Sequence, residues 1–172
     1  TLSLSTLAEW IGRIGVALQP LVDRLTLHLL QGRVLHADET PVAQLDPGSG
    51  KTQRAYLWAY RSNDFELGPR IIVFDYQTSR SGKHVQNFLN KWQGHLLVDD
   101  YSGYKALFSK TASPCTELGC WAHARRKFFD LHQANASTIA FEALQRIGKL
   151  YAVEAEGKHS STEARQILRA EK

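Results

Sequence analysis

The residues that could do chemistry are carboxylates placed where apolar strands give way to polar residues. Asp38 follows a strand-like run, and Asp99 and Asp100 close the apolar run 96–98. Carboxylates from two neighbouring strands can hold a divalent cation, because hard cations such as Mg²⁺ take oxygen ligands. A helical third carboxylate, for which Glu154 is the candidate, would complete a two-metal site for phosphoryl displacement. Aspartate at a strand end is also common turn chemistry, so both interpretations stay open.

Basic residues gather in one segment of the chain. Between Lys105 and Lys127 there are five basic residues and one acid, a surplus that equals the +4 of the whole sequence. A solvated helix face or a phosphate-binding surface explains such a cluster. If the cluster binds phosphates, we expect Arg125, Arg126, Lys127 and Lys105 to contact those of a nucleic acid.

Aromatic and sulfur-containing residues surround this basic segment. We expect Trp121, Phe128 and Phe129 to form the buried face of their helix rather than to stack on bases. Cys115, Cys120 and His123 have spacing that could suit zinc, although a structural zinc site nearly always has four ligands. Buried thiols with a hydrogen-bonded histidine are the favoured alternative.

Composition indicates a folded domain of 172 residues, because 43% of residues are apolar and 22% are charged. No apolar run approaches the roughly 18 residues that a membrane helix needs. Two cysteines cannot make a disulfide scaffold, and no secretory leader is recognisable, so we expect a cytoplasmic location. The chain begins at Thr1 and contains no methionine, which indicates a fragment of a longer protein.

The elements that must position the carboxylates alternate between strands and helices. A helical N-terminal segment is predicted, with a capping box at Thr6 and Glu9 and a division into two helices at Pro20. The pattern then predicts an order β-β-β-α-β, a mixed α/β sheet covered by helices. Everything after Ser102 is predicted as mainly helical. The expected strands are 34–42, 54–61, 70–76 and 95–98, and the expected helices are 82–92, 121–133, 137–157 and 162–171.

Four motifs occur in order and together resemble the catalytic region of bacterial DDE transposases of the insertion sequence 66 family. The resemblance implies a ribonuclease-H-like core over residues 32–157, an N-terminal helical segment over 1–31 and a C-terminal helical extension over 158–172. The motifs are His36–Pro41, Val98–Tyr104, Cys120–Phe129 and Leu150–Glu154.

The resemblance also assigns the catalytic and metal-binding triad. Asp38 matches its first acid, Asp99 its second and Glu154 its helical third. The position after the second acid is usually glycine in that family and is Asp100 here, so Asp100 stays an alternative ligand. Glu156 is the alternative to Glu154.

This resemblance implies DNA strand cleavage and strand transfer without a covalent protein intermediate. Two Mg²⁺ or Mn²⁺ ions are the implied cofactors, with no other small molecule. The implied partners are transposon ends and target DNA, a multimer on paired ends and other transposon-encoded proteins. Two other functions stay open: a ribonuclease-H-like nuclease that cleaves without joining, and a non-catalytic DNA-binding relic.

Overall fold

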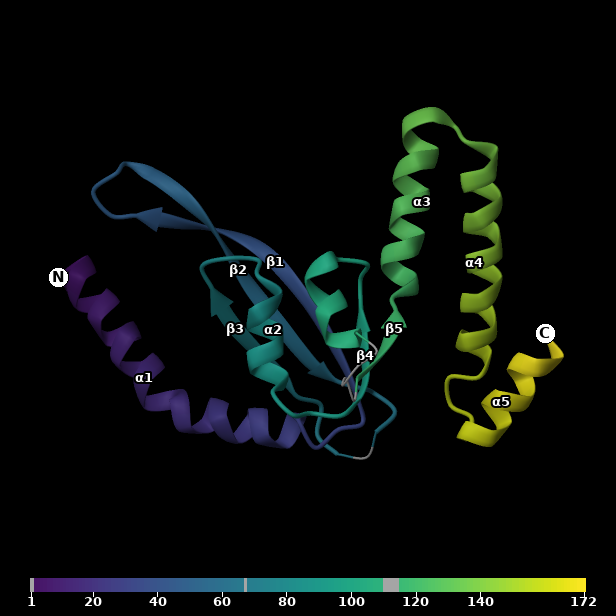
Figure 1. The fold of residues 1–172 in the computed structure, drawn as a ribbon, viewed down its shortest axis with the longest axis horizontal. Coiled ribbons are helices and arrows are strands. Elements are labelled where there is room, and N and C mark those ends of the chain that lie inside the picture. Colours follow the sequence, from purple (N-terminus) through teal and green to yellow (C-terminus); the bar gives the residue numbers. More distant parts are fainter. Residues whose placement is uncertain (1, 67, 110–114) are drawn as a thin grey trace. The chain divides into compact units, whose positions relative to one another are not determined.

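The computed structural model describes residues 2–66, 68–109 and 115–172, which form two compact units (Figure 1). The first unit comprises residues 1–119 and the second residues 120–172. Residues 32–157, predicted as the catalytic core, extend across this boundary, and that assignment stays a prediction. In the part of the chain that is described, no helix is long and apolar enough to cross a membrane.

The first unit is built on one five-stranded mixed sheet. Its strand order is β3-β2-β1-β4-β5; the pairs β1–β2 and β2–β3 are antiparallel, and β1–β4 and β4–β5 are parallel. The predicted order β-β-β-α-β is therefore confirmed, and with it the mixed α/β class. The strands are β1 (Val34–Asp46), β2 (Lys51–Ser62), β3 (Ile72–Gln77), β4 (Gly94–Val98) and β5 (Cys115–Gly119), and α2 (Gly82–Leu89) joins β3 to β4.

The edge strand β5 corrects the prediction that everything after Ser102 is mainly helical. The segment between β4 and the second unit contains a 3₁₀ helix, η1 (Ser102–Phe108), and then β5. β5 contains no alternating apolar pattern that would predict a strand, and Leu118 is its only aliphatic residue. Its conformation is set by five residue pairs with β4, from Gly94–Cys115 to Val98–Gly119.

The N-terminal segment is one helix, α1 (Leu4–Leu29), so the predicted division at Pro20 is wrong. A proline inside a helix removes one hydrogen bond and crowds the preceding turn, which bends a helix without necessarily ending it. The predicted capping box at Thr6 is also wrong. The helix begins earlier, where the hydroxyl of Ser3 accepts a hydrogen bond from the Thr6 N–H at 3.1 Å.

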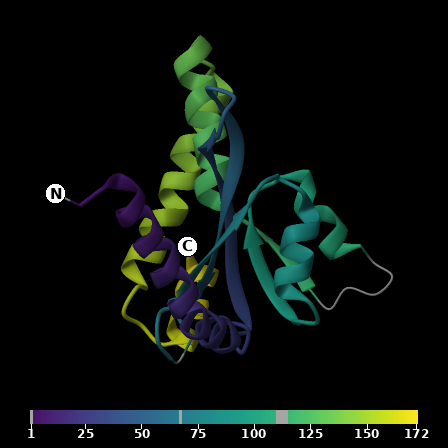
Figure 2. The same cartoon turned by 90° about the vertical axis from the view of Figure 1, so that its left-hand side faces the viewer.

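One face of the sheet carries the hydrophobic core of the first unit. α2 and η1 lie on this face (Figure 2), and side chains from both pack against inward-facing strand residues. Alternation along β1 directs Leu35, Ala37 and Glu39 to this face and Asp38 to the opposite one. The fully buried members with the largest side chains are Trp58, Tyr60, Tyr104, Leu29, Leu35, Leu89, Leu96, Val85 and Val98.

The second unit consists of three helices, α3 (Trp121–Asn135), α4 (Thr138–Glu156) and α5 (Thr162–Glu171), each close to its predicted range. α3 contains no buried residue. Trp121 is 54% exposed and Phe129 is 44% exposed, so the expectation that they belong to a buried face is wrong, whereas Phe128 is half-buried. α3 packs along α4 within this unit.

Candidate active site

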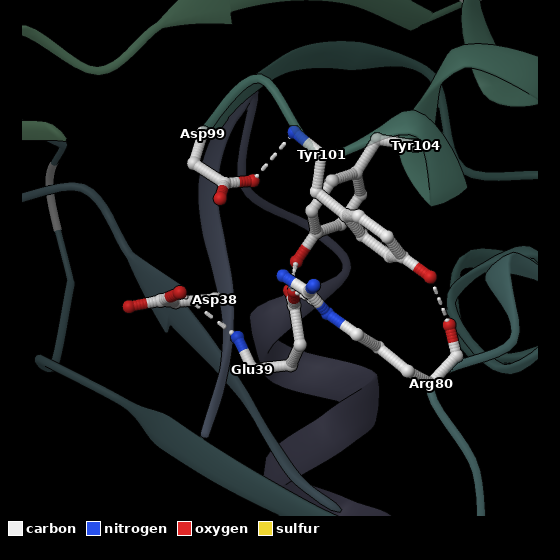
Figure 3. A network of polar contacts seen from close by, with 6 residues as sticks. All are labelled: Asp38, Glu39, Arg80, Asp99, Tyr101 and Tyr104. Atoms are coloured by element: carbon white, nitrogen blue, oxygen red, sulfur yellow. Dashed lines mark hydrogen bonds and ion pairs between the residues drawn. The ribbon is translucent and has the colours of Figure 1, made fainter. Parts of the chain in front are cut away.

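The parallel pairing of β1 with β4 brings two of the predicted carboxylates to neighbouring backbone positions. The last pair in this ladder is His36 with Leu97. Asp38 and Asp99 each lie two residues beyond this last pair, so they follow the paired region at the same level. Figure 3 shows both side chains. β1 itself continues beyond Asp38, as the outer part of the β1–β2 hairpin.

A backbone N–H orients each of the two aspartates. The Glu39 N–H donates to Oδ1 of Asp38 at 2.9 Å, and the Tyr101 N–H donates to Oδ1 of Asp99 at 2.9 Å. Each acceptor thus lies one or two residues before its donor. Such short-range hydrogen bonds restrict how a carboxylate can rotate, so the direction of each one follows the local backbone.

A buried glutamate, Glu39, lies beside this pair, and its side chain is only 1% exposed. Nε and Nη2 of Arg80 donate to its Oε1 at 2.8 and 2.5 Å, and the hydroxyl of Tyr104 donates to its Oε2 at 2.5 Å. Burying a carboxylate requires such partners, because an unpaired charge in the core is strongly unfavourable. Both carboxylate oxygens of Glu39 are therefore satisfied.

The sequence interpretation did not include Glu39, Arg80 or Tyr104 among the site residues. One signal was present for Glu39: it occupies an inward position of β1, after Leu35 and Ala37. A charged residue at an inward strand position needs a buried partner. The identity of that partner could not be predicted, because Arg80 is 41 residues away in the chain.

The pKa values of Glu39 and Arg80 are shifted by burial and by the charges around them. Burial raises the pKa of Glu39, and the hydrogen bonds from Tyr104 and Arg80 offset part of that rise. For Arg80, burial favours the neutral form, but the hydrogen bond and charge of Glu39 outweigh it and raise the pKa of the guanidinium. The negative charge of Asp99 acts on both residues in the same sense, raising each pKa.

Asp100 lies in a different environment from Asp99. Its side chain is 73% exposed, and its Oδ1 forms an ion pair with Nζ of Lys105 at 2.9 Å. Lys105 also contacts Oε1 of Glu117 at 2.7 Å. Lys105, predicted to contact DNA, therefore bridges two acids, and the choice between Asp99 and Asp100 as metal ligand stays a prediction.

The third predicted acid, Glu154, belongs to α4 in the second unit. Arg169 of α5 donates to both of its carboxylate oxygens, Nε to Oε1 at 2.6 Å and Nη2 to Oε2 at 2.7 Å. The alternative acid, Glu156, forms an ion pair with Lys172 at 2.6 Å. Both candidates therefore pair with cations near the end of the same unit.

Within the described residues, no group of three or more His, Cys, Asp or Glu side chains is arranged to hold a metal ion. The possible zinc ligands Cys115, Cys120 and His123, all described, form no such group either. The thiol of Cys115 instead donates to the carbonyl oxygen of Trp92 at 3.4 Å. The metal-binding role of Asp38, Asp99 and Glu154 stays a prediction.

The basic residues of α3 are at the surface of the second unit. Arg125, Arg126 and Lys127 are all exposed. The two arginines line a shallow depression between α3 and α4, whose other lining residues are Ala122, Phe129, Leu144, Gly148 and Tyr151. Exposed guanidinium groups beside an open depression are suited to phosphate contacts.

Together, these features define a mixed α/β protein with paired carboxylates at neighbouring strand positions, an arrangement suited to metal-assisted phosphoryl chemistry. Comparison with known families places it more narrowly. The model of the transposase IS66 family matches residues 1–172, and the chain belongs to that family.

Three curated relatives come from Sinorhizobium fredii (strain NBRC 101917 / NGR234), and all are described as uncharacterized proteins. The protein y4qI is 38% identical over 99% of this chain, y4jD 34% over 98% and y4hP 34% over 99%. These matches cover 33%, 34% and 34% of the respective relatives. The chain thus spans about a third of their length.

Proposed function

We propose that this chain provides the catalytic core of a DDE-type DNA transposase, with a ribonuclease-H-like fold. The observation that carries the proposal is the β1–β4 register, which places Asp38 level with Asp99 in a member of the transposase IS66 family. The sheet order β3-β2-β1-β4-β5, with antiparallel and parallel pairs in the positions described, supports the ribonuclease-H-like assignment. The reaction is metal-dependent cleavage and joining of DNA strands.

The side chains present fit divalent magnesium or manganese by the chemistry of their donors. Asp38 and Asp99 supply hard carboxylate oxygens from neighbouring segments, the ligand type that Mg²⁺ prefers. Glu154 is proposed as the third ligand, once its carboxylate is released from Arg169. Two bound ions would supply positive charge to the attacking and leaving oxygens of an in-line displacement at phosphorus.

The protein's own part in this reaction is position and electrostatics. The N–H groups of Glu39 and Tyr101 fix the direction of the two aspartates before DNA binds. Arg125, Arg126 and Lys127 are proposed to hold the DNA backbone, with Lys105 as a further contact. Paired transposon ends, target DNA, a multimer and other transposon-encoded proteins are proposed partners of the longer protein.

The test uses labelled DNA duplexes taken from both sides of the coding region, incubated with the chain and Mg²⁺ or Mn²⁺. We expect nicked products with 3′-hydroxyl ends and larger joined products, both absent for Asp38→Asn. Nicked products without joined products would favour the nuclease alternative. DNA binding without any metal-dependent cleavage would favour the relic.

A further inference from the structure

Arg80 connects the two chain segments that carry Asp38 and Asp99. Its guanidinium donates to Glu39, the residue after Asp38, and lies 3.7 Å from the ring centroid of Tyr101, two residues after Asp99. The backbone carbonyl of Arg80 also accepts a hydrogen bond from the Tyr101 hydroxyl at 2.5 Å. Figure 3 shows this arrangement, with Arg80 between the glutamate and the tyrosine. One residue thus contacts both segments through three kinds of interaction.

The residues that Arg80 contacts also orient the aspartates. Glu39 and Tyr101 donate their backbone N–H groups to Asp38 and Asp99, respectively. A shift in the backbone at either residue would therefore move the carboxylate that it holds. Arg80 itself is anchored outside the sheet, next to Ser81, the N-cap residue of α2.

The Glu39–Arg80 pair joins a buried carboxylate to a partly exposed guanidinium. The Glu39 side chain is 1% exposed, whereas that of Arg80 is 41% exposed, so the glutamate depends on the arginine more than the arginine depends on it. Removal of one partner from a buried ion pair leaves an uncompensated charge, which is strongly destabilising locally. Without Arg80, Tyr104 would be the one remaining side-chain donor among those described for Glu39.

We propose that Arg80 is a positioning residue that sets the separation and direction of Asp38 and Asp99 for a divalent ion, acting through Glu39 and Tyr101. This inference rests on the proposed function, because it assumes that the two aspartates bind metal. Arg80 is assigned no contact with reacting atoms. Residues that orient metal ligands in this way typically change metal affinity by about 10–100-fold when mutated.

The experiment measures Mn²⁺ affinity of the full chain by electron paramagnetic resonance, without DNA and without turnover. We expect Arg80→Ala to weaken Mn²⁺ binding by about 10–100-fold. Arg80→Lys is expected to restore only part of this loss, because an ammonium group lacks the planar fork that meets Glu39 and stacks on Tyr101. Arg70→Ala is the matched control: Arg70 is 81% exposed and lies 3.6 Å from Asp64, so wild-type affinity is expected.

Asp38→Asn separates failure of this inference from failure of the proposed function. If the wild-type chain has no Mn²⁺ site that Asp38→Asn removes, the metal site is wrong and the inference is overturned with it. If that site exists and folded Arg80→Ala has wild-type affinity and the wild-type spectrum, the positioning role is overturned while the proposed function stands. Circular dichroism checks folding. If Arg80→Ala does not fold, Tyr101→Ala replaces it, because it removes both the ring under the guanidinium and the hydroxyl that donates to the Arg80 carbonyl; wild-type affinity in that variant overturns the inference.

Discussion

Arg169 of α5 forms a bidentate ion pair with Glu154 of α4, with donor–acceptor distances of 2.6 and 2.7 Å. Both side chains are about half exposed, at 54% and 45%. The predicted third metal ligand is therefore neutralised by a cation from the same unit. Because a metal ion would compete with Arg169 for the same two oxygens, the proposed function requires this pair to open.

Replacing Arg169 by alanine should raise the pKa of Glu154 toward its ordinary value, because the hydrogen bond from Arg169 is the main cause of its lowered pKa. A lowered carboxyl pKa contributes stability above the unfolded-state pKa, and this contribution is lost as pH falls through the folded-state pKa. The contribution should be below about 1 kcal/mol, since exposed pairs are screened by solvent. Carbon-13 NMR titration of the Glu154 carboxyl measures the shift.

The matched control for this titration is Arg146→Ala. Arg146 pairs with Glu142 on the same helix, at 2.5 Å, and makes no described contact with Glu154. The Glu154 titration should be unchanged in this variant. An unchanged titration in Arg169→Ala as well would show that the ion pair does not control Glu154 in solution.

Substituting Asp38 or Asp99 by asparagine should abolish metal-dependent DNA cleavage and leave the fold nearly intact. Asparagine has the same shape but lacks the negative charge that a divalent cation requires. Asp100→Asn is the control, because Asp100 is 73% exposed and pairs with Lys105; activity should stay within a few-fold of wild type. Strand transfer by Asp38→Asn would rule out the triad. If Asp100→Asn lost metal-dependent cleavage while Asp99→Asn retained it, Asp100 and not Asp99 would be the metal ligand.

The double variant Arg125→Ala/Arg126→Ala should bind DNA more weakly and with a smaller dependence on salt. Each lost phosphate contact reduces the slope of log affinity against log salt concentration by about 1, so a change of about 2 is expected. Arg13→Ala serves as the control, because Arg13 is an exposed arginine that pairs with Glu9 on α1. Fluorescence anisotropy at several salt concentrations provides the measurement. Unchanged affinity and slope would contradict the assignment of α3 to DNA binding.

Gly82→Ala should destabilise the first unit, because α2 begins against the backbone of η1. A Cβ atom at Gly82 would lie 2.0 Å from the carbonyl oxygen of Gly103, and a backbone atom cannot rotate away. Overpacking of this kind costs about 1–3 kcal/mol or more. Gly15→Ala in α1 should instead stabilise the protein by about 0.5–1 kcal/mol. A Cβ atom at Gly15 would have no other atom within 4 Å, and alanine favours helices more than glycine does. Urea unfolding of both variants measures the change in the free energy of unfolding, which should be negative for Gly82→Ala and positive for Gly15→Ala.

Local patterns predicted most of the elements and failed where distant contacts decide conformation. The nearly apolar run 95–98 was predicted as a buried strand, and Leu96 and Val98 in β4 are at most 1% exposed. β5 was missed because its strand conformation comes from pairing with β4 rather than from its own residues. Pro20 was expected to divide the N-terminal segment into two helices. The helix-breaking tendency of proline is a local property, and it does not include the helical turns on either side of Pro20, through which α1 is continuous.

The sequence by itself determined the order β-β-β-α-β of the first four strands and their helix, the family, and the positions of Asp38 and Asp99 at strand ends. Side-chain alternation and apolar runs act over a few residues, so they are readable without the fold. The tertiary structure alone decided that Glu39 is buried, that Arg80 pairs with it across 41 residues, and that Glu154 is held by Arg169. These contacts depend on which surfaces meet in space, because charge pairing and burial are properties of the packed chain and not of its local sequence.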